Sequence, residues 1–492
     1  MRSSGILMHI SSLPSRYGIG TLGEEALKFV DFLKDSGQEY WQVLPVGPTS
    51  YGDSPYQSFS TFAGNPYFID LELLCGEGLL TAEECEAFPW GEKDDETDYG
   101  LLYQNRFQVL KKAYDRFCER TQEAYLEYCR ENREWLDDYA LFMTLKDLHQ
   151  GKPWYEWREE LKSRDIRAME QIRIMCAKEI DFWKMTQYLF AKQWKAVKQY
   201  AAQKGIRIIG DIPIYVSMDS ADVWADPELF ELDEDLKPVN VAGCPPDAFT
   251  ADGQLWGNPL FKWDVMEQDG FSWWLRRVKH LSELFDVIRI DHFRGFESYY
   301  AIPAGDENAK NGQWKKGPGL KLFNTLEEKL GKLHIIVEDL GFLTPEVLQM
   351  VKDSGYPGMK LLQFAFDGGN DNIYLPHNHI KNSVVYTGSH DNDTILGWAL
   401  HAPVHALQYA VEYLRLDQRE GYNWGMMKAA WASVSELSVV TMQDLLDLGS
   451  EARMNTPSTT GGNWKWRMKK GAYHGGLSEK LRHMMYVYGR LR

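Results

Sequence analysis

The stretch DVIRIDHFRG, residues 286–295, begins with the composition of a buried strand and ends with that of a polar site. Val287, Ile288 and Ile290 are β-branched and apolar, as residues of a strand inside a packed sheet are. Two arginines, an aspartate and a histidine crowd its far end before the first turn residue, Gly295. Charges are costly to bury, so this ending needs an explanation in the surrounding fold.

Seven further short apolar runs recur along the chain, and helical patterns lie between several of them. Near-continuous apolar runs are typical of strands that are covered on both faces. Eight such strands favour an α/β fold, the (β/α)8 TIM barrel, over a doubly wound sheet. The predicted strands are GILMHI (5–10), YWQVLPV (40–46), IRIIGDIPIYV (206–216), DVIRIDHF (286–293), HIIVEDLG (334–341), GMKLLQFAF (358–366), SVVYTGSHD (383–391) and SVVTMQDLL (438–446).

The helical patterns carry their own end signals. The segment 24–37 has an apolar stripe and closes on a glycine. Thr344 followed by Pro345 is a favourable N-cap and first-turn pair. The stretch 170–204 is strongly helical and ends just before the third predicted strand.

We predict one catalytic barrel domain over residues 1–492, interrupted by two large insertions. The first is a helical subdomain over residues 70–170, between the second and third strands, on the barrel rim. The second, residues 217–270, follows the third strand and is rich in Gly, Pro and Asp. Connections of that length are usually functional or disordered, and its aromatic content speaks against disorder. We expect a lid.

The charge balance excludes some classes of partner. Lys and Arg total 54 against 71 Asp and Glu, a formal net charge of −17. Such a surface repels phosphate backbones and anionic lipid, so we expect neither a nucleic-acid nor a membrane partner. The first residues contain no apolar run of signal-peptide length, and no transmembrane-length run follows.

Six cysteines are scattered at wide spacing, without a CxxC pair or a Cys/His cluster. This spacing argues against a zinc site and against a disulfide framework. We therefore expect a reduced, cytoplasmic protein without a zinc site.

Polar residues stand where several of the predicted strands end. In a (β/α)8 barrel the carboxyl ends of the strands form the active-site face. One such residue alone is as well explained by a cap or a salt bridge, but acids gathered at one mouth repel one another and cost stability. Their number therefore indicates function. They are Asp211, Arg289, Asp291, Glu338, His390 and Asp391.

Paired carboxylates without a metal-binding partner suit glycoside chemistry. Asp291 shares a strand face with Arg289, which favours its ionised form, as a nucleophile requires. Glu338 follows three apolar residues, a dry setting that favours a general acid. Two plain alternatives remain. Glu338 and Asp339 can belong to a barrel salt bridge. The motif SHDND, which carries His390 and Asp391, can be a helix N-cap, which Asp393 supplies by itself.

Many aromatic residues lie beside Gly, Pro, Asp or Asn rather than inside apolar runs. Aromatics make up 13% of the chain, and a large core explains most of them. Those in loops offer flat faces that suit the apolar C–H faces of sugar rings. Examples are SPYQSFSTFAGNPYF, GQLWGNPLFKWD and TTGGNWKW.

The motifs RIDHFRG, VEDLG and GSHDNDT, in this order, resemble the catalytic regions of α-amylase-type retaining enzymes. The flanking stretches SSLPSRYGIGTLG, SPYQSFSTFAGNPYFIDL, GDIPIYV, GQLWGNPLF, LQFAFDGG and NTPSTTGGNW resemble the amylomaltase family of 4-α-glucanotransferases, or disproportionating enzymes. The resemblance covers nearly the whole chain, from about residue 3 to about residue 466.

The resemblance implies a retaining transferase of carbohydrate metabolism. An α-1,4-glucan or maltooligosaccharide is cleaved, and its glucosyl chain passes to the 4-hydroxyl of another glucan or of glucose. It implies Asp291 as nucleophile, Glu338 as acid/base and Asp391 as transition-state stabiliser. The sugar-contacting residues that it implies are Tyr56, Asp211, Gln254, Trp256, Arg289, His292, Asp367, His390 and Asn463.

The chain departs from the family pattern in the lid, where CPPDAF carries Ala248 instead of an aromatic residue. Phe249 can replace that contact. The residues alone leave two alternatives open, an ordinary α-glucan hydrolase and an inactive glucan-binding protein. They also leave open whether the chain is a monomer or a small homo-oligomer.

Overall fold

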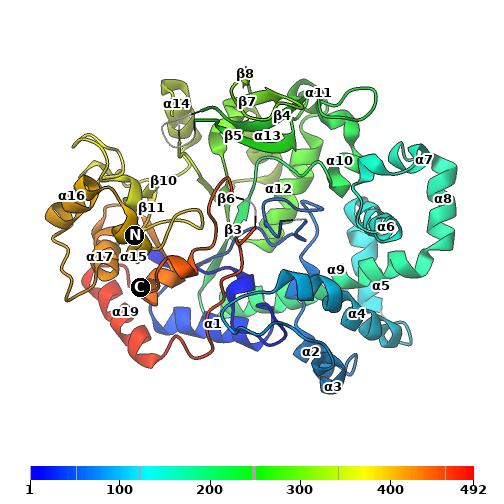
Figure 1. Ribbon diagram of the computed structural model, residues 1–492, viewed down its shortest axis with the longest axis horizontal. Helices are drawn as coiled ribbons and strands as arrows, with labels where there is room; N and C mark the ends of the chain where they lie inside the picture. Colours follow the sequence, from blue (N-terminus) through cyan, green and yellow to red (C-terminus); the bar gives the residue numbers. More distant parts are fainter. Residues whose placement is uncertain are drawn as a thin grey trace.

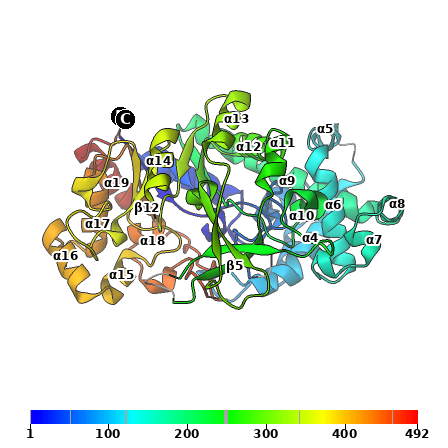
Figure 2. The ribbon, with the colours of Figure 1, turned by 90° about the horizontal axis from the view of Figure 1, so that it is seen from above.

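The computed structural model describes residues 2–50, 52–120, 123–246, 251–341, 343–459 and 461–491. Its centre is a closed barrel of eight parallel strands in the order β1-β12-β11-β10-β9-β6-β3-β2 (Figures 1 and 2). All eight predicted strands are present, which confirms the predicted fold class, but most are shorter than predicted, and residues 442–445 of the last one are helical. They are β1 (Ser3–Leu7), β2 (Tyr40–Gln42), β3 (Arg207–Ile212), β6 (Val287–Ile290), β9 (Ile335–Val337), β10 (Gly358–Leu361), β11 (Ser383–Tyr386) and β12 (Leu437–Thr441).

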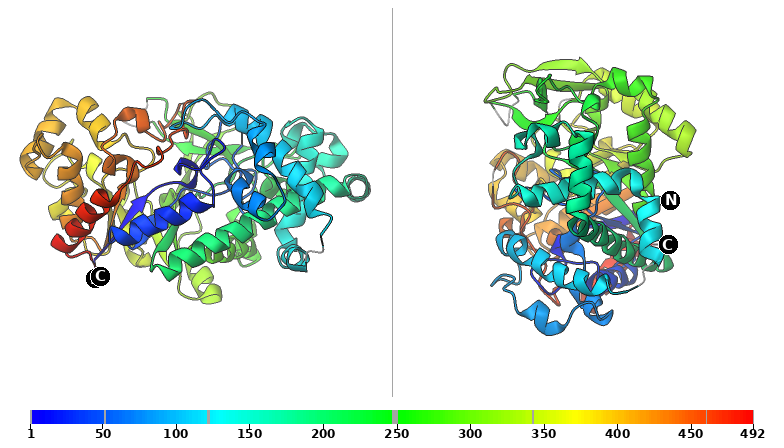
Figure 3. Two further views of the ribbon diagram at one scale, coloured as in Figure 1. Left: turned by 90° about the horizontal axis from the view of Figure 1, so that it is seen from below. Right: turned by 90° about the vertical axis from the view of Figure 1, so that its right-hand side faces the viewer.

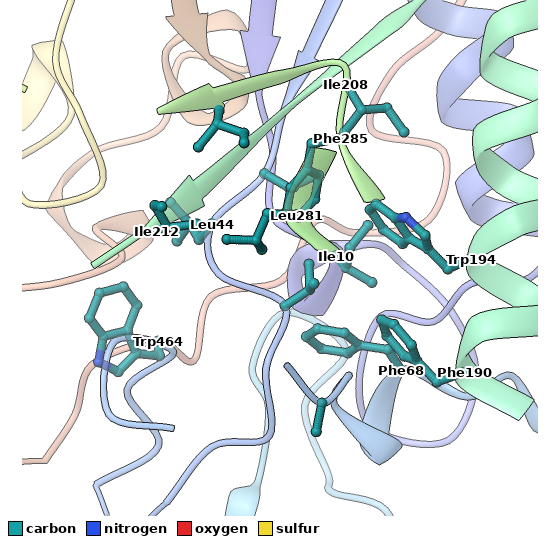
Figure 4. Close-up of a cluster of buried hydrophobic side chains, with 14 of the residues drawn as sticks. Ile10, Leu44, Phe68, Phe190, Trp194, Ile208, Ile212, Leu281, Phe285 and Trp464 are labelled. Atoms are coloured by element: carbon teal, nitrogen blue, oxygen red, sulfur yellow. The ribbon is translucent and has the colours of Figure 1, made fainter. Parts of the chain in front are cut away.

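The barrel strands bury side chains on both faces, which explains their continuous apolar runs. A separate apolar cluster, with Ile209, Ile336 and Val384 among its members, fills the barrel interior. Neighbouring residues of β3 point outward and pack under the helices (Figure 4). There Phe285 lies edge-on to Trp194, with 5.7 Å between ring centroids.

Helices cover the outside of the barrel at the positions that the sequence predicts. The segment 24–37 forms α1 (Glu24–Asp35). Thr344 accepts a hydrogen bond from the Val347 amide as N-cap of α14 (Pro345–Ser354), which confirms the predicted cap. The remaining outer helices are α12 (Ser272–Leu284), α13 (Leu320–Leu330), α15 (Ile395–His401), α16 (Val404–Leu414), α17 (Tyr422–Ala432), α18 (Met442–Leu445) and α19 (Gly475–Val487).

The chain between β2 and β3 is helical and extends to one side of the barrel (Figures 1 and 3). Its long last helix, α9 (Ala177–Gln203), packs against α6 and α1 and leads back to β3. The other helices of this segment are α2 (Leu71–Gly76), α3 (Ala82–Glu86), α4 (Tyr99–Phe117), α5 (Glu123–Glu131), α6 (Arg133–Leu148), α7 (Glu159–Lys162) and α8 (Ile166–Met175).

A second, four-stranded antiparallel sheet lies beside the barrel, in the order β5-β4-β7-β8 (Figure 1). Its strands β4 (Asn240–Cys244) and β5 (Gln254–Pro259) come from the insertion after β3, together with α10 (Ala221–Ala225) and α11 (Trp263–Gln268). Strands β7 (Ser298–Pro303) and β8 (Gln313–Lys316) follow β6, and the sequence analysis did not predict them.

The two ends of the described chain lie side by side in all views (Figures 1 to 3). The Arg490 guanidinium donates to the Ser3 carbonyl at 2.6 Å, and Arg2 donates to the Tyr488 carbonyl at 2.5 Å. Within the described ranges, no helix combines the length and the apolar character needed to cross a membrane.

Candidate active site

One buried guanidinium links the carboxyl ends of β3 and β6. Arg289 Nη1 lies 2.6 Å from both carboxylate oxygens of Asp211 and 3.1 Å from Asp291 Oδ1. The register of the two strands sets Asp211 opposite Arg289, and the strand's two-residue period brings Asp291 to the same face. These three predicted residues therefore form one charged group.

Asp291 is less acidic than its arginine neighbour alone suggests. Burial raises the pKa of its carboxyl to about 6, although Arg289 pulls the pKa down. From the sequence, Arg289 is expected to lower the pKa of Asp291. In the structure, however, Arg289 is shared with Asp211, whose charge raises the pKa of Asp291 further. Asp291 is still ionised at neutral pH.

Glu338, directly after β9, is the weakest acid of the group. Its two carboxylate oxygens accept hydrogen bonds from the backbone amides of His292 at 2.7 Å and Leu340 at 2.9 Å. Burial and then the charge of Asp291 raise its pKa to about 8, against the effect of Arg289. Glu338 therefore keeps its proton at neutral pH while Asp291 has lost its own.

The neighbouring acid, Asp339, has a different environment. It accepts from the Met359 amide at 2.7 Å and lies 4.0 Å from the Lys360 ammonium group. The salt-bridge alternative therefore applies to Asp339, whereas Glu338 accepts hydrogen bonds from backbone amides. Two adjacent carboxylates thus face two different environments.

The loop after β11 carries a third carboxylate, Asp391, and its pKa is low, unlike those of Asp291 and Glu338. Asp391 accepts from Asn455 Nδ2 at 2.6 Å and lies 3.4 Å from His390 Nε2. Burial alone would raise its pKa, but His390 and Asn455 outweigh burial and lower it to about 2. The same contact with Asp391 outweighs the effect of burial on His390 and raises the pKa of that imidazole.

Three rings from distant parts of the chain pack together beside these acids. Tyr56 stacks on His390 with 5.0 Å between centroids, and Trp464 lies 5.8 Å from Tyr56 and 5.9 Å from His390. The Tyr56 hydroxyl donates to Asp211 Oδ2 at 2.8 Å. This stack connects the loop after β2 with the groups at the ends of β3 and β11.

The hairpin of β4 and β5 presents two predicted residues to the end of β6. Trp256 meets the His292 ring edge-on, with centroids 4.9 Å apart, and its indole N–H donates to Gln254 Oε1 at 3.1 Å. His292 has a left-handed backbone, with φ at +53°, and burial lowers the pKa of its imidazole to about 3. His292 is therefore a neutral ring, and its Nε2 is buried without a hydrogen-bond partner among the described residues.

Two of the predicted residues are not brought into contact with this group. Asp367 is exposed on the loop after β10. Asn463 binds within its own loop, where Oδ1 accepts from the Thr456 amide at 3.0 Å and Nδ2 donates to Thr459 Oγ1 at 3.0 Å. Residues 247–250, which include Ala248 and Phe249, lie outside the described residues.

Sequence reasoning missed Asn455, and it noted Trp464 only as one of several aromatic residues in loops. Both belong to the motif NTPSTTGGNW, from which only Asn463 was named as a site residue. A polar residue and an indole in a Gly- and Pro-rich loop were the available signal, but their partners are more than 60 residues away in the sequence.

The helix-cap alternative for Asp393 is wrong. The N-cap of α15 is Thr394, whose hydroxyl accepts from the Gly397 amide at 3.1 Å. Asp393 instead accepts from Ser450 Oγ at 2.7 Å. The threonine one position later takes the cap, while the Asp393 carboxylate is engaged by the Thr394 amide and the Ser450 hydroxyl.

The arrangement combines an ionised carboxylate, a protonated carboxyl and a second ionised carboxylate at one face of the barrel. A pair of carboxyl groups whose environments separate their pKa values is the usual sign of an acid and a nucleophile or base. Such a pair can open a glycosidic bond by protonating the leaving oxygen while a carboxylate engages the sugar carbon.

Comparisons with known proteins agree with this chemistry. A family model described as 4-alpha-glucanotransferase matches residues 8–473. The chain is 49% identical to a 4-alpha-glucanotransferase of Clostridium butyricum, over 98% of this chain and all of that one. It is 48% identical to that of Thermus thermophilus, over 100% of this chain and 99% of the relative.

A solved structure agrees over the full length. The amylomaltase from Streptococcus agalactiae in complex with acarbose superposes with a TM-score of 0.98 at 41% identity, covering both chains completely. The amylomaltase from Corynebacterium glutamicum has a TM-score of 0.78 at 16% identity over 100% of this chain and 75% of that chain, which shows a shared fold. The chain belongs to the 4-alpha-glucanotransferase family.

Proposed function

We propose that Asp291, Glu338 and Asp391 carry the 4-α-glucanotransferase reaction by double displacement. In the first step Asp291 attacks the anomeric carbon of an α-1,4-glucan, and the bond to the leaving 4-oxygen breaks. Glu338 gives its proton to that oxygen, and the glucosyl chain rests on Asp291 as an ester.

The second step reverses the first with a new acceptor. The 4-hydroxyl of another glucan or of glucose attacks the anomeric carbon and releases Asp291. Glu338, now a carboxylate, takes the proton of that hydroxyl, so bonds and protons balance over the two steps. The side chains supply every group, so the proposal requires neither a metal nor an organic cofactor.

The single observation that carries this assignment is the contrast between the two carboxyl environments: Asp291 lies 3.1 Å from the Arg289 guanidinium, whereas Glu338 accepts hydrogen bonds from two backbone amides. Burial leaves Glu338 protonated and Asp291 ionised at the same neutral pH. Asp391, with its pKa lowered to about 2, supplies a fixed negative charge for the oxocarbenium-like transition state. The reverse assignment would need Glu338, which holds its proton at neutral pH, to act as the nucleophile.

The surrounding residues bind the sugar and limit water. Arg289, Asp211, Tyr56 and His390 form the connected group at the donor sugar, and Asp367 and Asn463 are proposed as contacts further along the glucan. Trp256 and Gln254, on the hairpin of β4 and β5, cover the site so that a sugar is favoured over water as acceptor. His292 beneath Trp256 offers a neutral ring to a sugar hydroxyl.

We also propose the substrates, the cellular location, the oligomeric state and the domain organisation of the chain. The substrates are α-1,4-glucans and maltooligosaccharides, and the chain works in the cytoplasm as a monomer or small homo-oligomer. The chain forms one catalytic domain with two insertions, the helical segment 70–170 and the lid segment 217–270. The acidic net charge of −17 supports a neutral substrate over nucleic acid or an anionic membrane.

The test is to trap the intermediate. Glu338→Gln protein is incubated with a fluorinated α-glucosyl fluoride, whose leaving group needs no acid, and peptides are mapped by mass spectrometry. A glucosyl ester on Asp291 supports the proposal, and one on another residue refutes it. With the unmodified protein and maltotriose, chain redistribution with little new reducing sugar distinguishes transfer from hydrolysis.

A further inference from the structure

The loop of residues 387–394 joins β11 to α15 and carries His390 and Asp391. One side chain, the carboxylate of Asp444, binds the backbone or side chain at both ends of this loop. Thr387 Oγ1 donates to Asp444 Oδ2 at 2.9 Å, and the amide of Ile395, the first residue of α15, donates to Oδ1 at 2.8 Å. One carboxylate therefore ties the first residue of the loop to the helix residue that follows its last.

Asp444 is itself held in place. It lies in α18, directly after β12, and is 2% exposed. Its amide donates to Thr441 Oγ1 at 3.2 Å, and its carbonyl accepts from Asn423 Nδ2 at 3.0 Å. A side chain fixed on both sides of its backbone makes a rigid support for the loop.

We propose that Asp444 is a positioning residue that fixes the loop of His390 and Asp391 by bonding both of its ends. This inference rests on the role proposed above for Asp391. Asp391 stabilises a transition state only if its carboxylate stays in place, and a displacement of about 1 Å can cost about a hundredfold in rate.

The chemistry of Asp444 is unfavourable for stability alone. Burial raises the pKa of its carboxyl to about 6, with Ile395, Thr441 and Thr387 acting in the opposite direction. Its carboxylate accepts from the Thr387 hydroxyl and the Ile395 amide, and the charge of Asp393 opposes its ionisation. An acid that is ionised at neutral pH there weakens folding, so a role beyond packing is favoured.

The test compares Asp444→Ala with Asp444→Asn and with a matched control, Asp70→Ala. Asp70 is 5% exposed and also binds a threonine hydroxyl, Thr21 Oγ1 at 2.6 Å, and a helix-start amide, Leu73 N at 2.9 Å. It lies at the start of α2, in the helical segment. The two aspartates thus have the same bonds and different surroundings.

Transfer from maltotriose gives kcat and KM, measured well below the Tm of each variant. Asp444→Ala is expected to lower kcat by about 10- to 100-fold with KM within about twofold. Asp444→Asn, which can still accept from Ile395, is expected to stay within about threefold of the unmodified protein. Asp70→Ala is expected to lower Tm and leave kcat unchanged.

Asp391→Asn distinguishes a failure of the positioning role of Asp444 from a failure of the proposed role of Asp391. If Asp391→Asn is inactive and Asp444→Ala keeps its kcat, the positioning role is wrong and the proposed function stands. If Asp391→Asn keeps full kcat, the proposed role of Asp391 is wrong. Should Asp444→Ala not fold, Thr387→Val removes one of the two bonds, and an unchanged kcat in that variant overturns the inference.

Discussion

In two barrel strands, β3 and β9, the apolar side chains that point into the barrel contrast with the acidic residue that follows on the same face. Ile209 and Ile336 lie in the apolar interior, and two positions later stand Asp211 and Glu338. Because inward side chains recur every second residue, the environment changes from apolar to charged within about 7 Å along the strand. The same strands thus build a core and a site.

The two layers have opposite effects on stability. The interior residues are buried and apolar, so they stabilise the fold through transfer from water and close packing. At the carboxyl ends, burial raises the pKa of both Asp291 and Glu338. A carboxyl whose folded pKa exceeds its unfolded value weakens folding as the pH rises between the two values. The stability of the apolar interior therefore offsets the destabilising charges of the site.

The largest expected effect comes from Asp291→Asn, which changes only the charged layer. We expect transfer to fall by about 10 000-fold or more, because the nucleophile is lost. Thermal unfolding at neutral pH is expected at the same or a higher temperature, since a destabilising charge is removed. Activity and Tm are measured on the same preparation, and a large drop in Tm would contradict the division into two layers.

Leu437→Ala probes the other layer, at the start of β12, in the apolar cluster of the barrel interior. We expect the free energy of unfolding to fall by about 2–5 kcal/mol, because a cavity replaces the side chain. At 25 °C kcat should stay within about twofold. Leu400→Ala, at a side chain that is 79% exposed on α15, is the control and should change stability by about 0.5 kcal/mol or less.

The pH profile tests the charged layer without a change of shape. The reaction needs ionised Asp291 and protonated Glu338, so kcat/KM should rise through about pH 6 and fall through about pH 8. The two groups interact, so the apparent pKa values belong to the pair. Glu338→Gln should remove the alkaline limb from its residual activity, whereas Asp339→Asn should keep both limbs. A profile that is flat across this range would refute the assignment.

The smallest expected effect is that of Trp256→Ala, which changes the cover over the charged layer. We expect the ratio of hydrolysis to transfer to rise by a few-fold, because water gains access to the intermediate. Leu255→Ala is the matched control, since Leu255 lies on the opposite side of β5 and is 42% exposed. Free glucose and chain redistribution from maltotriose give the ratio. If both activities fall together, Trp256 is only an anchor.

Elements that depend on local pattern were predictable. The eight strands, the cap at Thr344 and the charged strand ends follow from apolar runs and from residues a few positions apart. The four strands of the second sheet, β4, β5, β7 and β8, were not predicted, because their pairing joins segments on either side of β6: β7 pairs with β4, and β8 pairs with β7. The alternative that Asp393 caps α15 was one residue off, since the cap is Thr394.

By itself the sequence determined the strand count, the acids at the strand ends and, through its motifs, the family. Only the tertiary structure showed that Asp291 is itself buried and shares Arg289 with Asp211, since that depends on distances between residues of different strands. Only it joined Asn455 to Asp391, and Asp444 to the loop ends. Periodicity is a property of neighbouring residues, whereas pKa values and such contacts arise when distant segments share one small volume.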